Sequence, residues 1–161
     1  MSSASMTPRA VPWGQIASMV STSFSQGLTF QTDTTVNMEA VEVDSSFSWS
    51  EANDELTCNF DGRVLPSWSA DMDYQNDVRT GTDFYVEHDD GGGYAEVTGT
   101  RGGVYQRQST ISGSARVPVV VTVSSGDKLR LRAYLRDGDP SQVNIRSRGC
   151  NFLVQRIQGA S

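Results

Sequence analysis

The sequence predicts an all-β protein built as an antiparallel β-sandwich, and three observations carry this prediction. Apolar and polar residues alternate with a period of two in several segments, as expected for strands with one buried face. Turn-forming pairs such as Asp61-Gly62 stand between these segments. Sustained helical periodicity is hard to find anywhere along the sequence. A length of 161 residues fits one domain with a substantial core.

The clearest predicted strand is Lys128–Arg136. Its polar face carries Lys128, three arginines and Tyr134, so we expect that face in water or at an interface. Its other face, which we expect in the core, is formed by Leu129, Leu131, Ala133 and Leu135. A second valine-rich strand, Val117–Val123, precedes it, and Ser124–Asp127 predicts the turn between them.

Earlier and later segments follow the same strand-and-turn pattern. Alternation over residues 41–49 and 56–60 predicts two strands, and Asp61-Gly62 predicts a hairpin turn after the second. Residues 84–88 predict a strand that runs into the loop Asp89–Gly93. The last strand, residues 151–157, is apolar on both of its faces, so we expect both to be covered. This strand count and spacing indicate a sandwich or jelly roll over residues 23–161.

Residues 1–22 differ from the rest and predict an extended N-terminal arm. They are rich in small residues, with Pro8 and Pro12 near one another, and Gln15–Val20 could form a short helical turn or a first strand. A disordered tail is the plain alternative. Against it stands a set of apolar side chains that is unfavourable to leave in water, so we expect the arm to dock on another surface. This set comprises Val11, Trp13, Ile16, Met19 and Val20.

Charge is unevenly distributed along the chain, although the net charge is only -6. Residues 33–96 hold 16 acids against Arg63 and Arg79, whereas residues 97–161 hold 10 bases against three acids. Either a basic nucleic-acid face or mutual neutralisation, within the fold or across a subunit boundary, would explain this. Lys128 is the only lysine, and arginine favours paired, partly desolvated contacts, which supports neutralisation. We therefore expect no nucleic-acid partner.

Few residues suggest catalysis or metal binding. Cys58 and Cys150 lie in apolar strand contexts, which favours buried thiols, although a disulfide stays open. His88 is the single histidine, so a catalytic triad or a multi-histidine metal centre has little to build on. A calcium site formed by Glu87–Asp90 with Asp71, Asp73 and Asp77 is a minor alternative to a solvated acidic loop. We expect no enzyme, no cofactor and no metal.

Two further features concern ligands and membranes. Trp68 stands in the loop-like context Pro66-Ser-Trp-Ser69, which makes it the best candidate for an exposed ligand contact, whereas Trp49 belongs in the core. The longest apolar run, Val119–Val121, is far shorter than the roughly 20 residues of a membrane helix, and we expect no membrane partner. The amino terminus does not read as a secretory signal.

Residues 123–133, Val143–Arg146 and Phe152–Ile157 resemble the late strands of the C1q/TNF-like jelly roll. The shared features are an apolar strand, a Gly-Asp turn, an alternating strand, a short strand and a last strand near the carboxyl end. The resemblance implies a homotrimer in which strand faces of three protomers meet along a three-fold axis. The residues that it would place at this interface are Tyr134, Arg130, Arg132, Phe152 and Val154.

Chains with such a domain and a small-residue arm look like bacteriophage virion proteins. The function implied is a homotrimeric capsid decoration (cement) protein, made in the host cytoplasm, that docks on the capsid surface through its arm. Its partner would be the major capsid protein or another virion protein. The alternative is a receptor- or glycan-binding knob of a head fibre or tail fibre, for which Trp68 would contact a host surface glycan.

Overall fold

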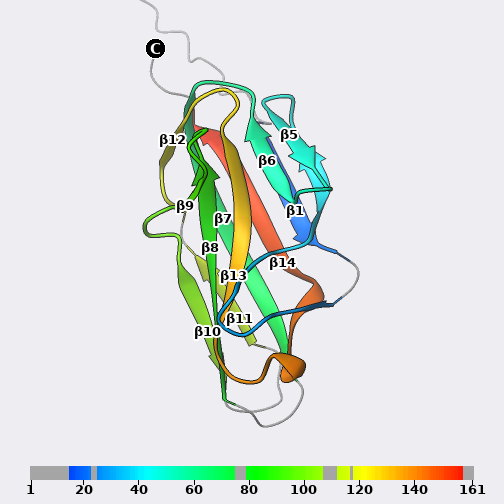
Figure 1. Ribbon diagram of the computed structural model, residues 1–161. Helices are drawn as coiled ribbons and strands as arrows, with labels where there is room; N and C mark the ends of the chain where they lie inside the picture. The colour runs from blue at the N-terminus through cyan, green and yellow to red at the C-terminus, as the bar shows by residue number, and fades with distance from the viewer. Residues whose placement is uncertain (1–14, 23–24, 75–78, 107–111, 117, 158–161) are drawn as a thin grey trace, which may run out of the picture.

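Two antiparallel β-sheets lie face to face in the structure (Figure 1). The computed structural model describes residues 15–22, 25–74, 79–106, 112–116 and 118–157. Within these segments the one helical element is a single 3-10 turn, η1 (Pro140–Gln142). None of the described helices is long and apolar enough to cross a bilayer. The all-β sandwich predicted from the alternation is confirmed.

The first sheet, called sheet A, has its strands in the order β11-β7-β14-β1-β4, with β12 added beside β7 and β2 beside β14. Its strands are β1 (Ile16–Ser21), β2 (Gln26–Gly27), β4 (Met38–Val43), β7 (Gly62–Tyr74), β11 (Ser112–Arg116), β12 (Val121–Val123) and β14 (Val143–Ile157).

The second sheet, called sheet B, has the order β10-β8-β13-β6-β5, with β3 added beside β13 and β9 beside β8. Its strands are β3 (Asp33–Thr35), β5 (Phe47–Ser50), β6 (Glu55–Cys58), β8 (Thr80–Asp89), β9 (Tyr94–Glu96), β10 (Gly102–Gln106) and β13 (Lys128–Asp137). Sequence neighbours therefore often lie in different sheets, as in jelly rolls.

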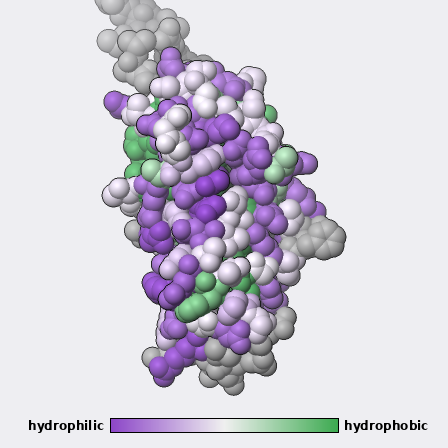
Figure 2. Space-filling model, viewed as in Figure 1, coloured by the Kyte–Doolittle hydropathy of each residue, from purple (hydrophilic) through white to green (hydrophobic). Residues whose placement is uncertain are grey.

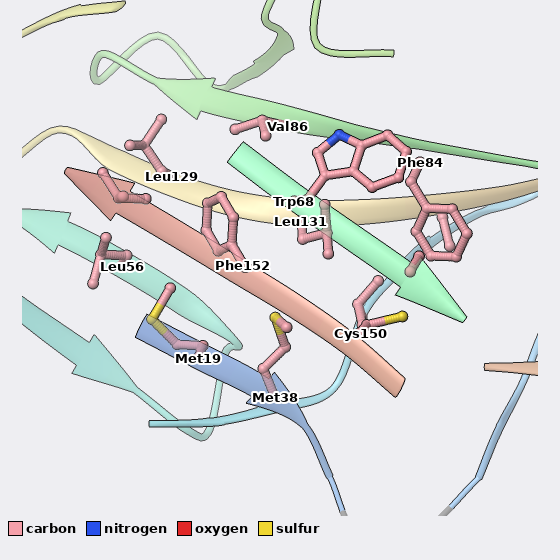
Figure 3. Packing of buried hydrophobic residues seen from close by; sticks show 14 of the residues in the cluster. Met19, Met38, Leu56, Trp68, Phe84, Val86, Leu129, Leu131, Cys150 and Phe152 are labelled. Carbon is pink, nitrogen blue, oxygen red and sulfur yellow. The ribbon is translucent and has the colours of Figure 1, made fainter. Parts of the chain in front are cut away.

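The core lies between the sheets, and the alternating residues of β13 show why. Leu129, Leu131 and Leu135 are at most 1% exposed, while the residues between them stay half-buried on the outside. Side chains of sheet A, including Met19, meet them from the opposite side (Figure 3). Burial of this many apolar side chains, each contributing about 1.5–3 kcal/mol, provides the main driving force for the fold.

The predicted boundary between arm and domain at residue 22 is wrong, because β1 is an interior strand of sheet A. It pairs with β14 on one side and β4 on the other. Met19 is fully buried in the core, and Ile16 and Val20 are half-buried on the outer face of the same strand. The apolar spacing that suggested docking on another surface reflects burial within the domain itself. Val11 and Trp13 lie outside the described residues.

The Asp61-Gly62 turn is also different from the predicted hairpin. It connects β6 of sheet B to β7 of sheet A, so the flanking strands do not pair with each other. The Ser124–Asp127 turn makes the reverse crossing, from β12 to β13, with Gly126 at φ 102°. Turn-forming residues in a sequence indicate that the chain changes direction, but they do not indicate which sheet the next strand joins.

A wide bulge interrupts β14 opposite β7. Ile145 pairs with Met72 and Cys150 pairs with Ala70, so the four residues 146–149 of β14 stand opposite the single residue Asp71 of β7. The hydroxyl of Ser21 spans the bulge: it donates to the Arg146 carbonyl oxygen at 3.1 Å and accepts from the Cys150 backbone N–H at 3.1 Å. This buried serine thus fixes both ends of the bulge.

Replacing Ser21 with alanine is expected to lower the free energy of unfolding by about 1–3 kcal/mol, because the buried Cys150 N–H loses its acceptor. Urea denaturation followed by tryptophan fluorescence measures the change. Ser67→Ala is the matched control, since the Ser67 hydroxyl makes only an exposed 3.5 Å contact with the Leu153 carbonyl oxygen. Equal losses for the two variants would contradict the role of Ser21.

Candidate functional site

The outer face of sheet B is covered by charged side chains that pair within the chain. All four basic residues of β13 contact an acid of a neighbouring strand. The pairs are Lys128 Nζ with Glu55 Oε1 at 2.8 Å, Arg130 Nε with Glu87 Oε2 at 2.7 Å, Arg132 Nε with Glu87 Oε2 at 3.5 Å, and Arg136 Nη1 with Asp83 Oδ1 at 3.1 Å. The basic and acidic halves of the sequence therefore neutralise each other inside one protomer.

Aromatic rings strengthen this network. The Arg130 guanidinium lies 3.5 Å from the centre of the Tyr94 ring, and Arg101 lies 3.9 Å from that of Tyr85. Burial raises the pKa of Tyr85 to about 12, and its hydrogen bond to the Asp33 carboxylate adds to that effect. Burial, then the bond to Glu55, also raises the pKa of Tyr94. Both phenols therefore stay protonated donors at neutral pH.

The contacts within the chain remove the reason for placing Arg130 and Arg132 at a subunit interface. Both guanidinium groups bind Glu87 of their own chain, and Arg132 also donates to the Asp33 carbonyl oxygen at 2.8 Å. Tyr134 lies half-buried on the same face, beside β3. The charges of Arg130 and Arg132 are therefore paired within the chain, without a neighbouring protomer.

Replacing Glu87 with glutamine is expected to lower the free energy of unfolding by about 2 kcal/mol, because two partly buried arginines lose their carboxylate. The Glu87 side chain is 12% exposed, and those of its partners are 21% and 13% exposed. Glu96→Gln, at a pair whose side chains are 36% and 37% exposed, is the control and is expected to change stability by less than about 1 kcal/mol. Urea denaturation compares them; an equal loss would count against a special role for Glu87.

The outer face of sheet A has the opposite character. Three adjacent strands, β1, β14 and β7, present an area without a charged residue, which we call the uncharged face. Its nine residues form three cross-strand rows: Ile16, Gln155 and Leu65; Ser18, Leu153 and Ser67; Val20, Asn151 and Ser69. Leu153, in the middle, is 37% exposed. Glu39 and Glu42 of β4 border this area.

Phe152 and Val154, predicted at a trimer interface, are instead fully buried in the protomer core. They share the inward parity of β14, while Leu153 between them points outward. The closing strand is apolar on both parities, so the sequence alone could not tell which side faces the opposite sheet. Leu153 is the residue of this strand that a partner could cover.

Trp68, predicted as an exposed ligand contact, is 3% exposed and belongs to the core. Its indole Nε1 donates to the Thr100 carbonyl oxygen at 2.8 Å, and its ring lies 5.4 Å from that of Phe84. The misleading signal was Pro66, which suggested a loop. In the structure β12 pairs with β7 up to Val64 and β11 from Trp68 onward, so Pro66 lies in the gap between them, where no ladder N–H is needed.

The predicted calcium ligands do not come together. Asp71 and Asp73 lie on β7 in sheet A, whereas Glu87–Asp90 belong to β8 and its turn in sheet B. Within the part of the chain that the structure describes, no group of three His, Cys, Asp or Glu residues is arranged to hold a metal. Asp77 lies outside that part.

The cysteines are separate as well. Cys58 is on β6 of sheet B and Cys150 on β14 of sheet A, and both thiols are free and buried. Burial raises the pKa of each thiol to about 12, so neither is a reactive thiolate at neutral pH. The disulfide that the sequence left open is therefore not formed.

His88 is the next-to-last residue of β8, and a carboxylate holds its ring. Its Nε2 lies 2.8 Å from Asp127 Oδ2, which also accepts from the Ser124 backbone N–H at 2.9 Å. The hydrogen bonds of the described residues bring no hydroxyl or thiol nucleophile against the ring. The contact ties β8 to the turn before β13, as a structural histidine would.

A hollow of about 380 Å³ opens beside His88, between β9 and β12. Its lining is mixed, with hydrophobic residues at the upper left edge of the molecule near β12 (Figure 2). The lining residues are His88, Asp90, Gly93, Ala95, Glu96, Val97, Thr98 and Val119–Thr122. Nothing in the sequence pattern signalled it, because its two walls come from segments more than 20 residues apart in different sheets.

Comparison with solved structures finds the same architecture elsewhere. The chain is similar to murine APRIL at 10% sequence identity, with 88% of this chain and 98% of that chain covered; the TM-score is 0.60 for the structure at pH 8.0 and 0.64 for that at pH 5.0. It is similar to Eiger TNF from S. frugiperda at 9% identity, with a TM-score of 0.64 over 91% of this chain and 94% of that chain.

Sequence comparisons add nothing to this likeness: no protein-family model matches the chain, and no curated protein matches it. At such low identity the structural likeness concerns the fold alone. It agrees with the strand order, the crossings between sheets and the resemblance of the late strands. The chain has the TNF-like jelly-roll fold.

Proposed function

We propose that this chain is a structural, non-enzymatic protein that forms a homotrimer through the uncharged face of sheet A and decorates the surface of a phage capsid. The observation that carries the trimer is the contrast between the two outer faces. The charged side chains of sheet B form ion pairs within the chain, whereas sheet A presents nine neighbouring uncharged residues with Leu153 at their centre. Depletion of charge at the centre with acids at the border is typical of a protein interface.

The arrangement of three copies also suits this face. When each copy uses this face to contact a different surface of the next copy, and successive copies are rotated by 120°, three copies close into a ring. The outer face of one sheet of this TNF-like jelly roll would provide such a contact. Sheet B would then face outward, where its ion pairs are already satisfied. The protein would be made in the host cytoplasm and reside on the virion.

Docking on the shell is assigned to the segment before β1. Val11 and Trp13 remain the candidate contacts there, whereas Ile16, Met19 and Val20 belong to β1. Removing residues 1–20 would take most of β1 out of sheet A, so the informative deletion is residues 1–14.

Two measurements on purified protein test the proposal. Sedimentation equilibrium at micromolar concentration is expected to give three times the 17.5 kDa chain mass for both the full chain and the deletion of residues 1–14. Imaging of capsids mixed with each protein is expected to show binding by the full chain only. A monomeric mass would overturn the trimer; capsid binding by the shortened chain would overturn the role of the segment.

A receptor- or glycan-binding knob of a head or tail fibre is the second candidate. Burial of Trp68 removes the contact first assigned to it, but Tyr105 on β10 is 49% exposed and offers a ring on which a sugar could stack. A glycan array probed with the wild type and with Tyr105→Ala tests this. Binding lost in the variant would favour the knob over the cement protein.

A further inference from the structure

The hollow lies on one open side of the sandwich. Farther down that side, β10 of sheet B lies next to β11 of sheet A, which closes the gap between the sheets (Figure 1). Toward the other end, β9 and β12 occupy the corresponding places but stand apart, with the hollow between them. We call this opening the edge slot.

Both strands that border the edge slot are edge strands. In the described part of the chain, β9 pairs with β8 and β12 pairs with β7, and neither has a second partner. The Val97 N–H donates to the Val86 carbonyl oxygen at 2.9 Å, so by the period of two the backbone groups of Glu96 point away from β8. Such an edge accepts an extended peptide as an added strand.

The lining defines which peptide fits. Ala95, Val119 and Val120 offer apolar contacts, and Val120 is 55% exposed. The charged lining residues are Asp90 and Glu96, with no lysine or arginine among them. This lining disfavours an anionic ligand and favours one with a positive charge beside apolar side chains.

Asp90 is the lining carboxylate that could pair with a basic side chain of a ligand. Glu96 is already paired with Arg101, whose Nε lies 3.0 and 3.1 Å from the two carboxylate oxygens. The Asp90 Oδ1 accepts the Gly92 backbone N–H at 3.1 Å, and no described lysine or arginine forms an ion pair with Asp90. The neighbouring Asp89 is held by the N–H groups of Gly93 and Gly91, which lower its pKa and keep this rim anionic.

We propose that the edge slot binds an extended segment of a partner protein in which a lysine or arginine alternates with β-branched residues. The segment pairs with the free edge of β9 or β12, packs its apolar side chains on Val119 and Val120, and places its basic side chain at Asp90. None of the nine residues of the uncharged face takes part, so the proposal stands whether or not the chain forms a trimer.

The probe is a synthetic nonapeptide of alternating threonine, valine and lysine with acetylated and amidated ends. Titration into ¹⁵N-labelled full-length protein, followed by NMR, is expected to shift the amides of Glu96, Thr98 and Thr122. Replacing the peptide lysines with glutamates is expected to weaken binding at least about threefold, as is Asp90→Asn in the protein. Asp137→Asn, which removes an exposed acid at the far end of β13, is expected to change nothing.

A modified peptide and a further protein variant test backbone pairing and access to the edge slot separately. A peptide with N-methyl groups on its pairing edge keeps its side chains but cannot join a strand, and it is expected to lose binding. Val120→Lys, at an exposed position that the fold tolerates, is expected to abolish binding by closing the slot with a like charge.

The proposal is overturned if the glutamate or N-methylated peptide binds as well as the lysine peptide, or if the shifts map to the uncharged face instead. It is also overturned if the lysine peptide fails to bind at millimolar concentration. Shifts at the slot that appear on raising the protein concentration alone would identify a second copy of this chain as the occupant. Sedimentation of the same samples reports separately on the proposed trimer.

Discussion

Lysine in place of Leu153 is expected to convert the proposed trimer into monomers that remain folded. Leu153 is the exposed centre of the uncharged face, so the variant would bury one unpaired ammonium group in each of the three interfaces of the assembly. Burying an unpaired charge costs several kcal/mol per group, which exceeds what the remaining contacts of a small interface can offset. The variant side chain is free to reach water in the monomer, so stability of the fold itself should change little. Sedimentation equilibrium measures the mass.

Phe30→Lys is the matched control. Phe30 is 42% exposed, and its bridge to Leu135 places it beside sheet B. The same charge is thus introduced at a similarly exposed apolar position away from the uncharged face, and the proposed trimer is expected to persist. Monomers from both variants, or trimers from both, would contradict the assignment of the interface to sheet A.

Alanine in place of Trp68 is expected to lower the free energy of unfolding by about 4 kcal/mol, among the largest effects of any single substitution in this chain. The indole fills the space between the sheets next to Phe84 and supplies the donor for the Thr100 carbonyl oxygen. Chemical denaturation measures the loss. Because a protein so weakened can lose any binding activity by unfolding, loss of function in Trp68→Ala would say nothing about a ligand site.

Trp68→Phe separates the two contributions of this residue. Phenylalanine keeps most of the apolar volume but cannot donate to Thr100, so the expected loss is about 1–3 kcal/mol. A near-zero change for Trp68→Ala would contradict the burial of Trp68, and a full loss for Trp68→Phe would mean that the hydrogen bond outweighs the packing.

Local alternation was enough to predict β13 and the all-β class, because a strand with one buried face repeats every two residues wherever it lies. The same rule gives no clear answer for residues 16–21, because the buried parity of β1 includes Ser21 whereas Ile16 and Val20 lie on the half-buried outer parity. The sequence therefore left a first strand, a helical turn and an arm as alternatives. Only pairing with β14 and β4 shows that this segment is an interior strand.

The candidate site was harder to predict because its contacts join distant parts of the chain. Glu87 lies 43 residues before Arg130, and nothing local indicates that β8 and β13 would bring them together. The resemblance to a trimeric family suggested a neighbour for these arginines, whereas strand pairing supplies a partner within the chain. Likewise, only the register of β14 decides that Phe152 points inward and Leu153 outward.

The position of β1 also bears on how this polypeptide reaches its native state during translation. Ser21 leaves the ribosome well before its partner Cys150, which follows 129 residues later. At about 5–20 residues per second, the wait is roughly 6–26 seconds, during which one flank of β1 has no strand to join. The nascent chain must therefore keep Met19 from misassociating until β14 has been synthesised, and we expect its yield in cells to depend on translation speed and chaperone supply.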